Sequence, residues 1–208
     1  MASSTDPQEA ESASAKQRRR KRISDTATAL FFEHGFERVS IADIAAAAGV
    51  SKMTVTNHFA LKEDLVFDEF DDDLTAIRAR LRPAASIADA VDAVEEYCVE
   101  RELRGGAARS LAAGADAWPA FAGIVVGSRT LTQRFHAHYV DVGDIIAQTL
   151  PATTDAAVAA WMLAEAVHLV DWWPFDAIAQ GLPVAEIRAG RVAVRERTFA
   201  ALRRGLGG

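Results

Sequence analysis

Apolar residues recur at helical spacing through most of the chain, and no stretch of useful length alternates as a half-buried strand would. This spacing predicts helices over residues 16–34, 40–48, 52–59, 62–81, 86–103, 107–126, 128–150, 154–179 and 184–204. Glycine or proline separates most of these segments, because glycine favours the left-handed position after a helix and proline cannot continue one. We therefore predict an all-α fold.

Two short predicted helices joined by one tight turn lie within residues 38–65. Ser40 can cap the first helix, since its hydroxyl can accept from a free backbone N–H. Gly49 ends that helix in the left-handed region. Ser51 can cap the second, whose buried positions are Val55 and Phe59. The segment predicts a helix-turn-helix whose second helix is free to enter a DNA major groove.

A basic run, KQRRRKR at residues 16–22, leads into the first predicted helix. That helix ends at Gly35, with Phe36 placed to contact the preceding turn. The run could be a solvated helix start, or it could lie across phosphate or reach into the minor groove. Because adjacent cations repel one another unless a polyanion is present, we favour the contact with DNA.

The order of these elements resembles the TetR family of bacterial transcriptional repressors. The resemblance covers roughly the first third of the chain, on the scale of one small DNA-binding module. The matching residues are Gly35-Phe36, Ser40-Ile41, Asp43-Ile44-Ala45, Ala48-Gly49-Val50-Ser51, Thr54-Val55, His58-Phe59, Lys62 and Leu65. The resemblance implies a three-helix DNA-binding domain followed by a larger helical domain. In the family, that larger domain encloses a mostly apolar ligand pocket, and its last two helices pair with those of a second subunit.

Thirteen residues are predicted to contact DNA: Arg18, Arg19, Arg20, Arg22, Ser40, Ser51, Lys52, Met53, Thr54, Thr56, Asn57, His58 and Lys62. Lys52 can donate to guanine, Asn57 can pair with adenine in a bidentate contact, and the Thr54 methyl can touch a thymine methyl. The alternative for Lys52 and Asn57 is that both are simply solvated.

The resemblance also assigns contacts to the DNA backbone. Ser40 matches a capping Thr or Ser, His58 matches a Tyr or His, and Lys62 matches a lysine that typically bonds phosphate. Thr56 departs from the family, where a tyrosine that donates to phosphate is common. The shorter threonine puts that contact in doubt.

Aromatic residues are abundant in the C-terminal two thirds. We predict a ligand pocket lined by Trp118, Phe121, Phe135, Tyr139, Trp161, His168 and Trp172. His168 could instead be a partly buried polar group satisfied by a neighbour. The seven-residue repeat of the 184–204 helix suits helix–helix packing. We predict a dimer interface of Trp161, Ile187, Val192, Val194 and Phe199, and packing within one chain is the alternative.

Charge is divided unevenly along the chain. The net charge is −6, yet residues 16–65 carry nine Lys or Arg against six Asp or Glu. This places positive charge where DNA would bind. A single cysteine, Cys98, excludes an internal disulfide, and neither a secretory signal nor a membrane-spanning run is present. We expect a soluble cytoplasmic protein.

The predicted domains are a disordered tail at 1–15, a helix-turn-helix domain at 16–61 and an effector-binding and dimerisation domain at 62–208. The acidic residues of 68–73 point in different directions on a helix, so no metal site is predicted. No catalytic constellation is present, and we expect neither an enzyme nor a cofactor.

These observations predict a sequence-specific DNA-binding transcriptional regulator. We expect a homodimeric repressor that a small apolar ligand releases from a pseudo-palindromic DNA operator, with no membrane partner. The alternative is a DNA-binding factor without a small-molecule effector, controlled by a protein partner or by its own abundance.

Overall fold

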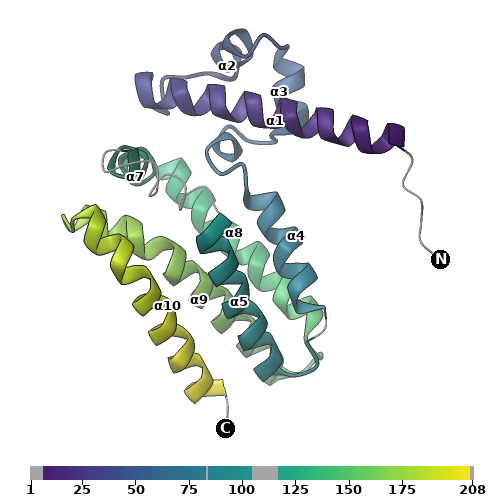
Figure 1. The fold of residues 1–208 in the computed structure, drawn as a ribbon, viewed down its shortest axis with the longest axis vertical. Coiled ribbons are helices and arrows are strands. Elements are labelled where there is room, and N and C mark those ends of the chain that lie inside the picture. The colour runs from purple at the N-terminus through teal and green to yellow at the C-terminus, as the bar shows by residue number, and fades with distance from the viewer. Residues whose placement is uncertain (1–6, 83, 105–116, 207–208) are drawn as a thin grey trace. The chain divides into compact units, whose positions relative to one another are not determined.

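The computed structural model describes residues 7–82, 84–104 and 117–206, and all regular structure in these ranges is helical (Figure 1). The all-α prediction is confirmed. The chain divides into two compact units, Met1–Asp68 and Glu69–Gly208. The first ten residues of the helix predicted over 107–126 lie outside the described residues.

The first unit contains four helical elements, which are α1 (Pro7–His34), α2 (Ile41–Ala47), α3 (Lys52–His58) and the short 3₁₀ helix η1 (Glu63–Leu65). Helix α1 packs against α2 and η1, and α2 packs against α3. The core of the unit lies where these elements meet. The fully or almost fully buried side chains include Ile23, Ala27, Phe31, Phe36, Ile44, Val55, Phe59 and Leu65.

Helix α1 begins at Pro7, nine residues before the predicted start. Residues 7–15 are therefore helical rather than part of a disordered tail, and residues 1–6 lie outside the described range. Proline is well suited to the first helical position, where its missing N–H has no helical partner. The Glu and Ala residues that follow are good helix formers.

The predicted caps and stops of the first unit are confirmed. The Ser40 hydroxyl accepts from the Asp43 N–H at 3.2 Å, and the Asp43 carboxylate accepts from the Ser40 N–H at 2.9 Å. Ser51 accepts from the Thr54 N–H at 3.0 Å. Gly35 and Gly49 have φ of +82° and +65°, values that favour glycine. These local bonds fix where α2 and α3 begin.

The second unit contains α4 (Phe70–Leu81), α5 (Ile87–Arg104), α7 (Ala117–Gly127), α8 (Arg129–Thr149), α9 (Thr154–Ala179) and α10 (Val184–Leu206). Helices α8 and α9 pack side by side, α10 lies against α9 and α5, and α4 lies against α5 and α8 (Figure 1). None of the described helices combines the length and apolar character needed to cross a membrane.

The segment predicted as one helix over 62–81 is broken. Residues 66–69 separate η1 from α4, so that prediction is wrong. Leu65, Phe67 and Phe70 are all buried. A continuous helix would turn Leu65 and Phe67 about 200° apart, since each residue advances by about 100°. The break allows all three side chains to leave solvent.

Helix α9 lies close to its neighbour where α8 carries a glycine. A Cβ atom on Gly143 would lie 2.7 Å from the Trp161 ring. The missing side chain therefore makes room for the indole between the two helices. Trp161 nevertheless remains 47% exposed, because only one side of its ring is covered by α8.

His138 of α8 is buried against the first turn of α4. Its ring stacks on Phe70, with centroids 3.8 Å apart and planes within 5°. Only 1% of His138 is exposed, and its Nδ1 has no hydrogen-bond partner. Burial, together with nearby Arg101 and Arg134, lowers the pKa of His138 from 6.5 to about 2. The folded protein therefore holds this ring neutral.

This buried imidazole predicts a defined loss of stability in acid. As pH falls below 6.5 the unfolded chain takes up a proton at His138, while the folded protein does not until the pH nears 2. Its contribution to stability is complete above pH 6.5 and decreases as pH falls towards 2, by on the order of 1 kcal/mol for each pH unit below 6.5.

The variant His138→Phe keeps a flat ring beside Phe70 but cannot bind a proton. Urea unfolding of both proteins at pH 7.5 and 5.5 should show that the free energy of unfolding of the variant falls by on the order of 1 kcal/mol less than that of the wild type over this interval. Equal losses in the two proteins would contradict the assignment.

Candidate nucleic-acid interface

Helix α3 buries one side and presents the other to solvent. Val55 is 0% exposed and Phe59 is 2% exposed, as the pattern predicts. Lys52, Met53 and Asn57 are exposed, and Met53 is the most open large apolar side chain in the described part of the chain, at 71%. The buried apolar side chains thus hold α3 against the first unit, and the opposite face of the helix stays accessible to a binding partner.

The polar residues of α3 fall into two groups. Lys52 and Asn57 make no hydrogen bond to any other described residue, so their donors are available to a partner. Thr54 is half-buried and its Oγ1 lies 2.8 Å from the Ser51 Oγ. The Thr56 Oγ1 donates to the Met53 carbonyl at 3.2 Å. Both threonine hydroxyls are therefore engaged within the helix.

The two capping serines are exposed at the starts of α2 and α3. The Ser40 Oγ donates to the Asp43 carboxylate at 2.6 Å, so its only hydroxyl proton is already used. The hydrogen bonds from Ser40 lower the pKa of Asp43. A contact from either serine to the DNA backbone stays a prediction, and Ser40 would have to exchange its present acceptor to donate.

Lys62 has partners within the protein. Its Nζ donates to the carbonyls of Phe36 at 2.8 Å and Val39 at 3.1 Å. It also lies 4.0 Å from the centroid of the Phe36 ring. The ammonium group thus closes the turn between α1 and α2. Two of the three N–H donors of this ammonium group are used within the protein, so the predicted contact of Lys62 with phosphate stays a prediction that would use the third.

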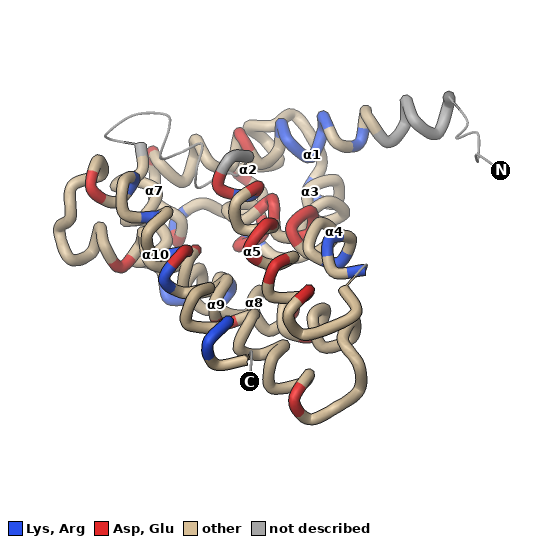
Figure 2. Tube along the Cα trace, turned by 60° about the horizontal axis from the view of Figure 1, so that its bottom comes forward, with Lys and Arg blue, Asp and Glu red and all other residues tan. Residues whose placement is uncertain are grey.

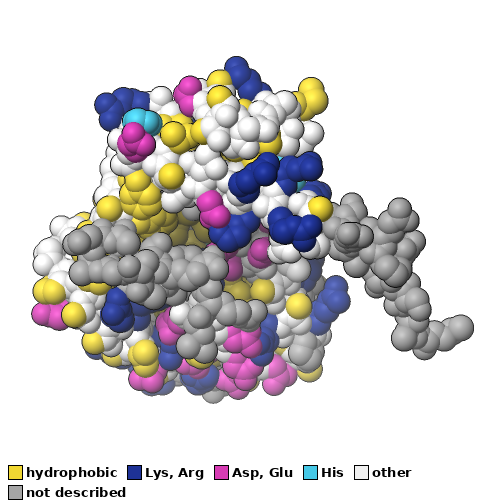
Figure 3. Space-filling model, turned by 45° about the horizontal axis from the view of Figure 1, so that its top comes forward, with side chains coloured by type: hydrophobic (Ala, Val, Ile, Leu, Met, Phe, Trp, Pro, Cys, Tyr) yellow, Lys and Arg dark blue, Asp and Glu magenta, His cyan; other side chains and the backbone are white. Residues whose placement is uncertain are grey.

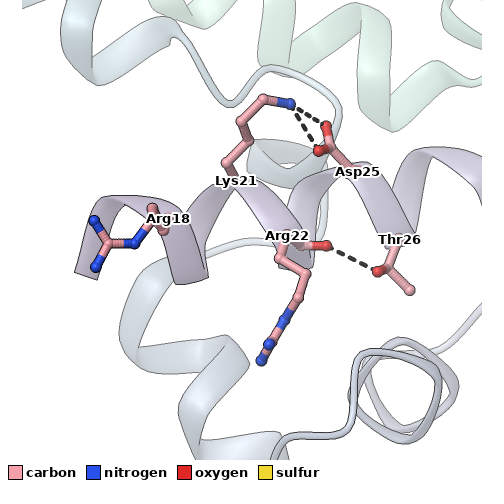
Figure 4. A pocket seen from close by; sticks show the side chains of 5 residues that line it. All are labelled: Arg18, Lys21, Arg22, Asp25 and Thr26. Carbon is pink, nitrogen blue, oxygen red and sulfur yellow. Dashed lines mark hydrogen bonds and ion pairs between the residues drawn. The ribbon is translucent and has the colours of Figure 1, made fainter. Parts of the chain in front are cut away.

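The basic run of α1 is mostly exposed. Its Lys and Arg positions lie in the middle part of the helix (Figure 2), and Lys and Arg side chains gather on the surface of the first unit (Figure 3). Figure 4 shows Arg18, Lys21 and Arg22 around a shallow groove on α1. Lys21 pairs with Asp25 at 2.7 Å, and Arg18 donates to Ser14. The Arg22 guanidinium extends away from that ion pair, which leaves it available to phosphate (Figure 4).

Arg20 is the exception in this run, since it is half-buried. Its guanidinium donates to the His58 carbonyl and, at 3.1 Å, to the Asp68 carbonyl. It also lies 4.2 Å from the centroid of the Phe59 ring. Two of the five guanidinium N–H groups thus face carbonyls of the protein, and a contact of Arg20 with DNA stays a prediction that would rest on the remaining donors.

His58 ends α3 and is half-buried. Burial lowers its pKa, and the positive charges of Lys16, Arg19 and Arg20 lower it further. The ring is therefore neutral near pH 7 and carries one N–H, so any predicted contact with phosphate would be a hydrogen bond rather than an ion pair.

The predicted pocket residues of the second unit largely form one aromatic cluster. The Phe135 ring centroid lies 5.1 Å from Trp172, 5.2 Å from Tyr139 and 5.4 Å from Phe175. Trp118 and Phe121 join through Phe175, and His168 joins through Phe135. Trp161 lies apart, exposed above Gly143, so we withdraw it from the pocket.

A buried ionic network adjoins this cluster and was missed at the level of sequence. Arg101 of α5 pairs with Asp73 of α4 at 3.0 Å and also pairs with Asp171 of α9. The Tyr139 hydroxyl donates to Asp171 at 2.8 Å. Burial raises the pKa of Asp73. The network joins the first turn of α4 to α5, α8 and α9.

The alternative that His168 is a partly buried polar group with a neighbour fits its contacts. Its Nε2 lies 2.7 Å from the His136 Nδ1, and its Nδ1 lies 3.1 Å from Glu165. Among the described residues no group of three or more acidic, His or Cys side chains could hold a metal ion.

Three of the predicted interface residues belong to the core of their own chain. Ile187, Val194 and Phe199 are buried where α10 meets α5 and α9. We withdraw them, because reaching a second subunit would require α10 to leave its own core. Val192 and Trp161 are exposed.

The comparisons with known proteins agree with this geometry. Residues 23–68 match the model of the bacterial regulatory proteins of the tetR family. The putative mycofactocin biosynthesis transcriptional regulator MftR of Mycobacterium tuberculosis (strain ATCC 25618 / H37Rv) is 39% identical over 59 residues. That match spans 28% of this chain and only 30% of the relative.

Solved structures extend the likeness in fold to nearly the whole chain. A TetR-family regulator from Streptomyces coelicolor A3 aligns with a TM-score of 0.55 at 20% identity, over 92% of this chain and 96% of that one. The SmeT–triclosan complex aligns with a TM-score of 0.53 at 19% identity, over 88% and 91%. Residues 23–68 thus match the tetR family of bacterial regulatory proteins, and nearly the whole chain is similar in fold to a solved TetR-family regulator.

Proposed function

We propose that the protein is a DNA-binding transcriptional regulator that reads the major groove with α3. The observation that carries this proposal is the orientation of that helix. Val55 and Phe59 lock it to the first unit, while Lys52, Met53 and Asn57 project outward. Positive charge on the neighbouring α1 supplies the attraction to phosphate that such a helix needs.

The three outward side chains have distinct base preferences. Lys52 donates to guanine, Asn57 forms a bidentate contact with adenine, and the Met53 side chain meets a thymine methyl. Arg19 and Arg22 bind the phosphate backbone, which sets the register of the protein without selecting sequence. The half-site therefore contains both G·C and A·T pairs within the reach of one helical turn.

The protein acts as a homodimer in this proposal. Val158, Trp161, Met162 and Leu169 form an exposed apolar stripe on α9, and Val192 is exposed on α10. The stripe follows the spacing of one helix face, which suits pairing with a second copy. Two α3 helices related by a two-fold axis would read half-sites about 34–36 Å apart, or multiples of that distance.

The second unit receives an apolar effector at the aromatic cluster and acts through α4. The similar fold of SmeT, solved with triclosan, supports a small apolar ligand as the first class to test. Phe70 and Asp73 hold the first turn of α4 to the other helices, so a ligand that displaces their partners would shift α4. A coupling of about 1–3 kcal/mol would reduce operator affinity about 5–150-fold.

Occupancy of the operator excludes other proteins from the same grooves, so we propose repression, with release by the effector. Selection of bound DNA from a random pool tests binding, symmetry and spacing together. A palindromic consensus with the expected spacing supports the proposal. Recovery of no enriched sequence at low salt would overturn it. Triclosan titrated into the protein–DNA complex then tests release.

Substitutions on α3 should separate the readers of sequence from the rest. Lys52→Ala and Asn57→Ala should each weaken operator binding by about 1–3 kcal/mol and relax the preference at one base pair. Competition binding on operators with single base changes measures both effects.

Arg22→Gln provides the matched comparison, since it removes a cation that faces phosphate. This variant should weaken all sequences alike and reduce the slope of log K against log salt by about 1. If Lys52→Ala also leaves every base preference intact, α3 does not read bases through that residue.

A charge placed on the α9 stripe should prevent pairing of subunits. Trp161→Glu is expected to give a monomer by sedimentation, because a carboxylate would have to be buried without a partner. Operator affinity should then fall to that of a single half-site.

Val126→Glu is the control, since Val126 is an exposed valine on α7, outside the stripe. It should leave the dimer intact. A Trp161→Glu protein that still sediments as a dimer would rule out this face.

A further inference from the structure

Arg20 is set apart from the cations around it by helix geometry. It lies three residues before Ile23 and four before Ser24, both of which are buried. Residues at these spacings share one face of a helix. Arg20 therefore continues the inward stripe of α1 by one turn, whereas Arg19 and Arg22 face solvent.

The guanidinium of Arg20 connects two separate segments of the first unit. One nitrogen donates to the carbonyl of His58, the last residue of α3. The other donates at 3.1 Å to the carbonyl of Asp68, the last residue of the unit. The group also lies 4.2 Å from the centroid of Phe59, the buried anchor that follows α3.

Each of these contacts stabilises the end of α3 or fixes the position of Asp68. The last carbonyls of a helix lack partners within it, and a cation there complements the helix dipole. The planar fork of arginine carries several fixed donors, so one side chain can hold two acceptors at a defined separation. A lysine in the same place offers a point charge on a flexible stem and cannot fix that separation.

We propose that Arg20 is a positioning residue that couples the end of α3 to the segment entering α4. Because one guanidinium serves both carbonyls, a displacement of Asp68 withdraws a partner from Arg20 and loosens the C-terminal end of α3. This inference rests on the proposed function for its effect on DNA, but the mechanical link itself concerns only the protein.

The test compares Arg20→Lys with Arg19→Lys and Arg19→Gln in the full-length protein. Arg20→Lys keeps the charge and removes the fork. Amide hydrogen exchange should then accelerate together at residues 56–59 and 66–68, with α2 and the second unit unchanged. Operator affinity should fall about tenfold, on the order of one lost hydrogen bond to a charged group, with an unchanged salt slope.

If Arg19 faces phosphate, its variants should change the salt dependence of binding and leave hydrogen exchange unchanged. Arg19→Lys should bind like the wild type, and Arg19→Gln should lower the salt slope by about 1 with normal exchange in α3. Unchanged exchange at both segments in Arg20→Lys, or acceleration at only one of them, would overturn the coupling. If exchange changes at both segments but no variant binds DNA, the coupling stands and the proposed function fails.

Discussion

Burial of Val55 and Phe59 is the constraint on which the DNA-binding surface depends. Val55 lies within α3 and Phe59 directly follows it; the helix has only seven residues, and an isolated helix of that length is not stable in water. Removing each side chain from solvent contributes about 1.5–3 kcal/mol. That contribution holds α3 in place, and the direction of Lys52 and Asn57 follows from it.

The second unit is ordered by a different balance, between apolar packing and buried charge. Arg101 lies between the carboxylates of Asp73 and Asp171, which come from helices far apart in sequence. Removing one member of such a network costs about 3–5 kcal/mol, because a charge is left without its partner. The network therefore specifies the placement of α4 more strictly than apolar contacts alone, which tolerate sliding.

Local chemistry in the sequence predicted the first unit well. Ser40, Gly35 and Gly49 each act within a few residues, so their roles as cap and helix stops could be read directly. The break at residues 66–69 could not, because it depends on burying Leu65 and Phe67 against distant side chains. Arg20 was grouped with its exposed basic neighbours, although its spacing from Ile23 and Ala27 already places it on the buried face of α1.

In the second unit, the sequence pattern did not identify which elements pack together. A seven-residue apolar repeat in 184–204 predicts packing but does not say against which helix, and Ile187 and Phe199 proved to face their own chain. Ionic partners such as Arg101 and Asp171 are separated by 70 residues, a pairing that one sequence cannot reveal.

The absence of a side chain at Gly143 of α8 determines how Trp161 lies on the exposed face of α9. The indole of Trp161 can lie flat only while position 143 lacks a side chain, since a methyl group there would sit 2.7 Å from the ring. A change as small as alanine would lift the tryptophan outward and reshape the exposed apolar stripe of α9. In the proposed dimer, the shape of the pairing surface would therefore be set in part by a residue that lies beneath it rather than on it.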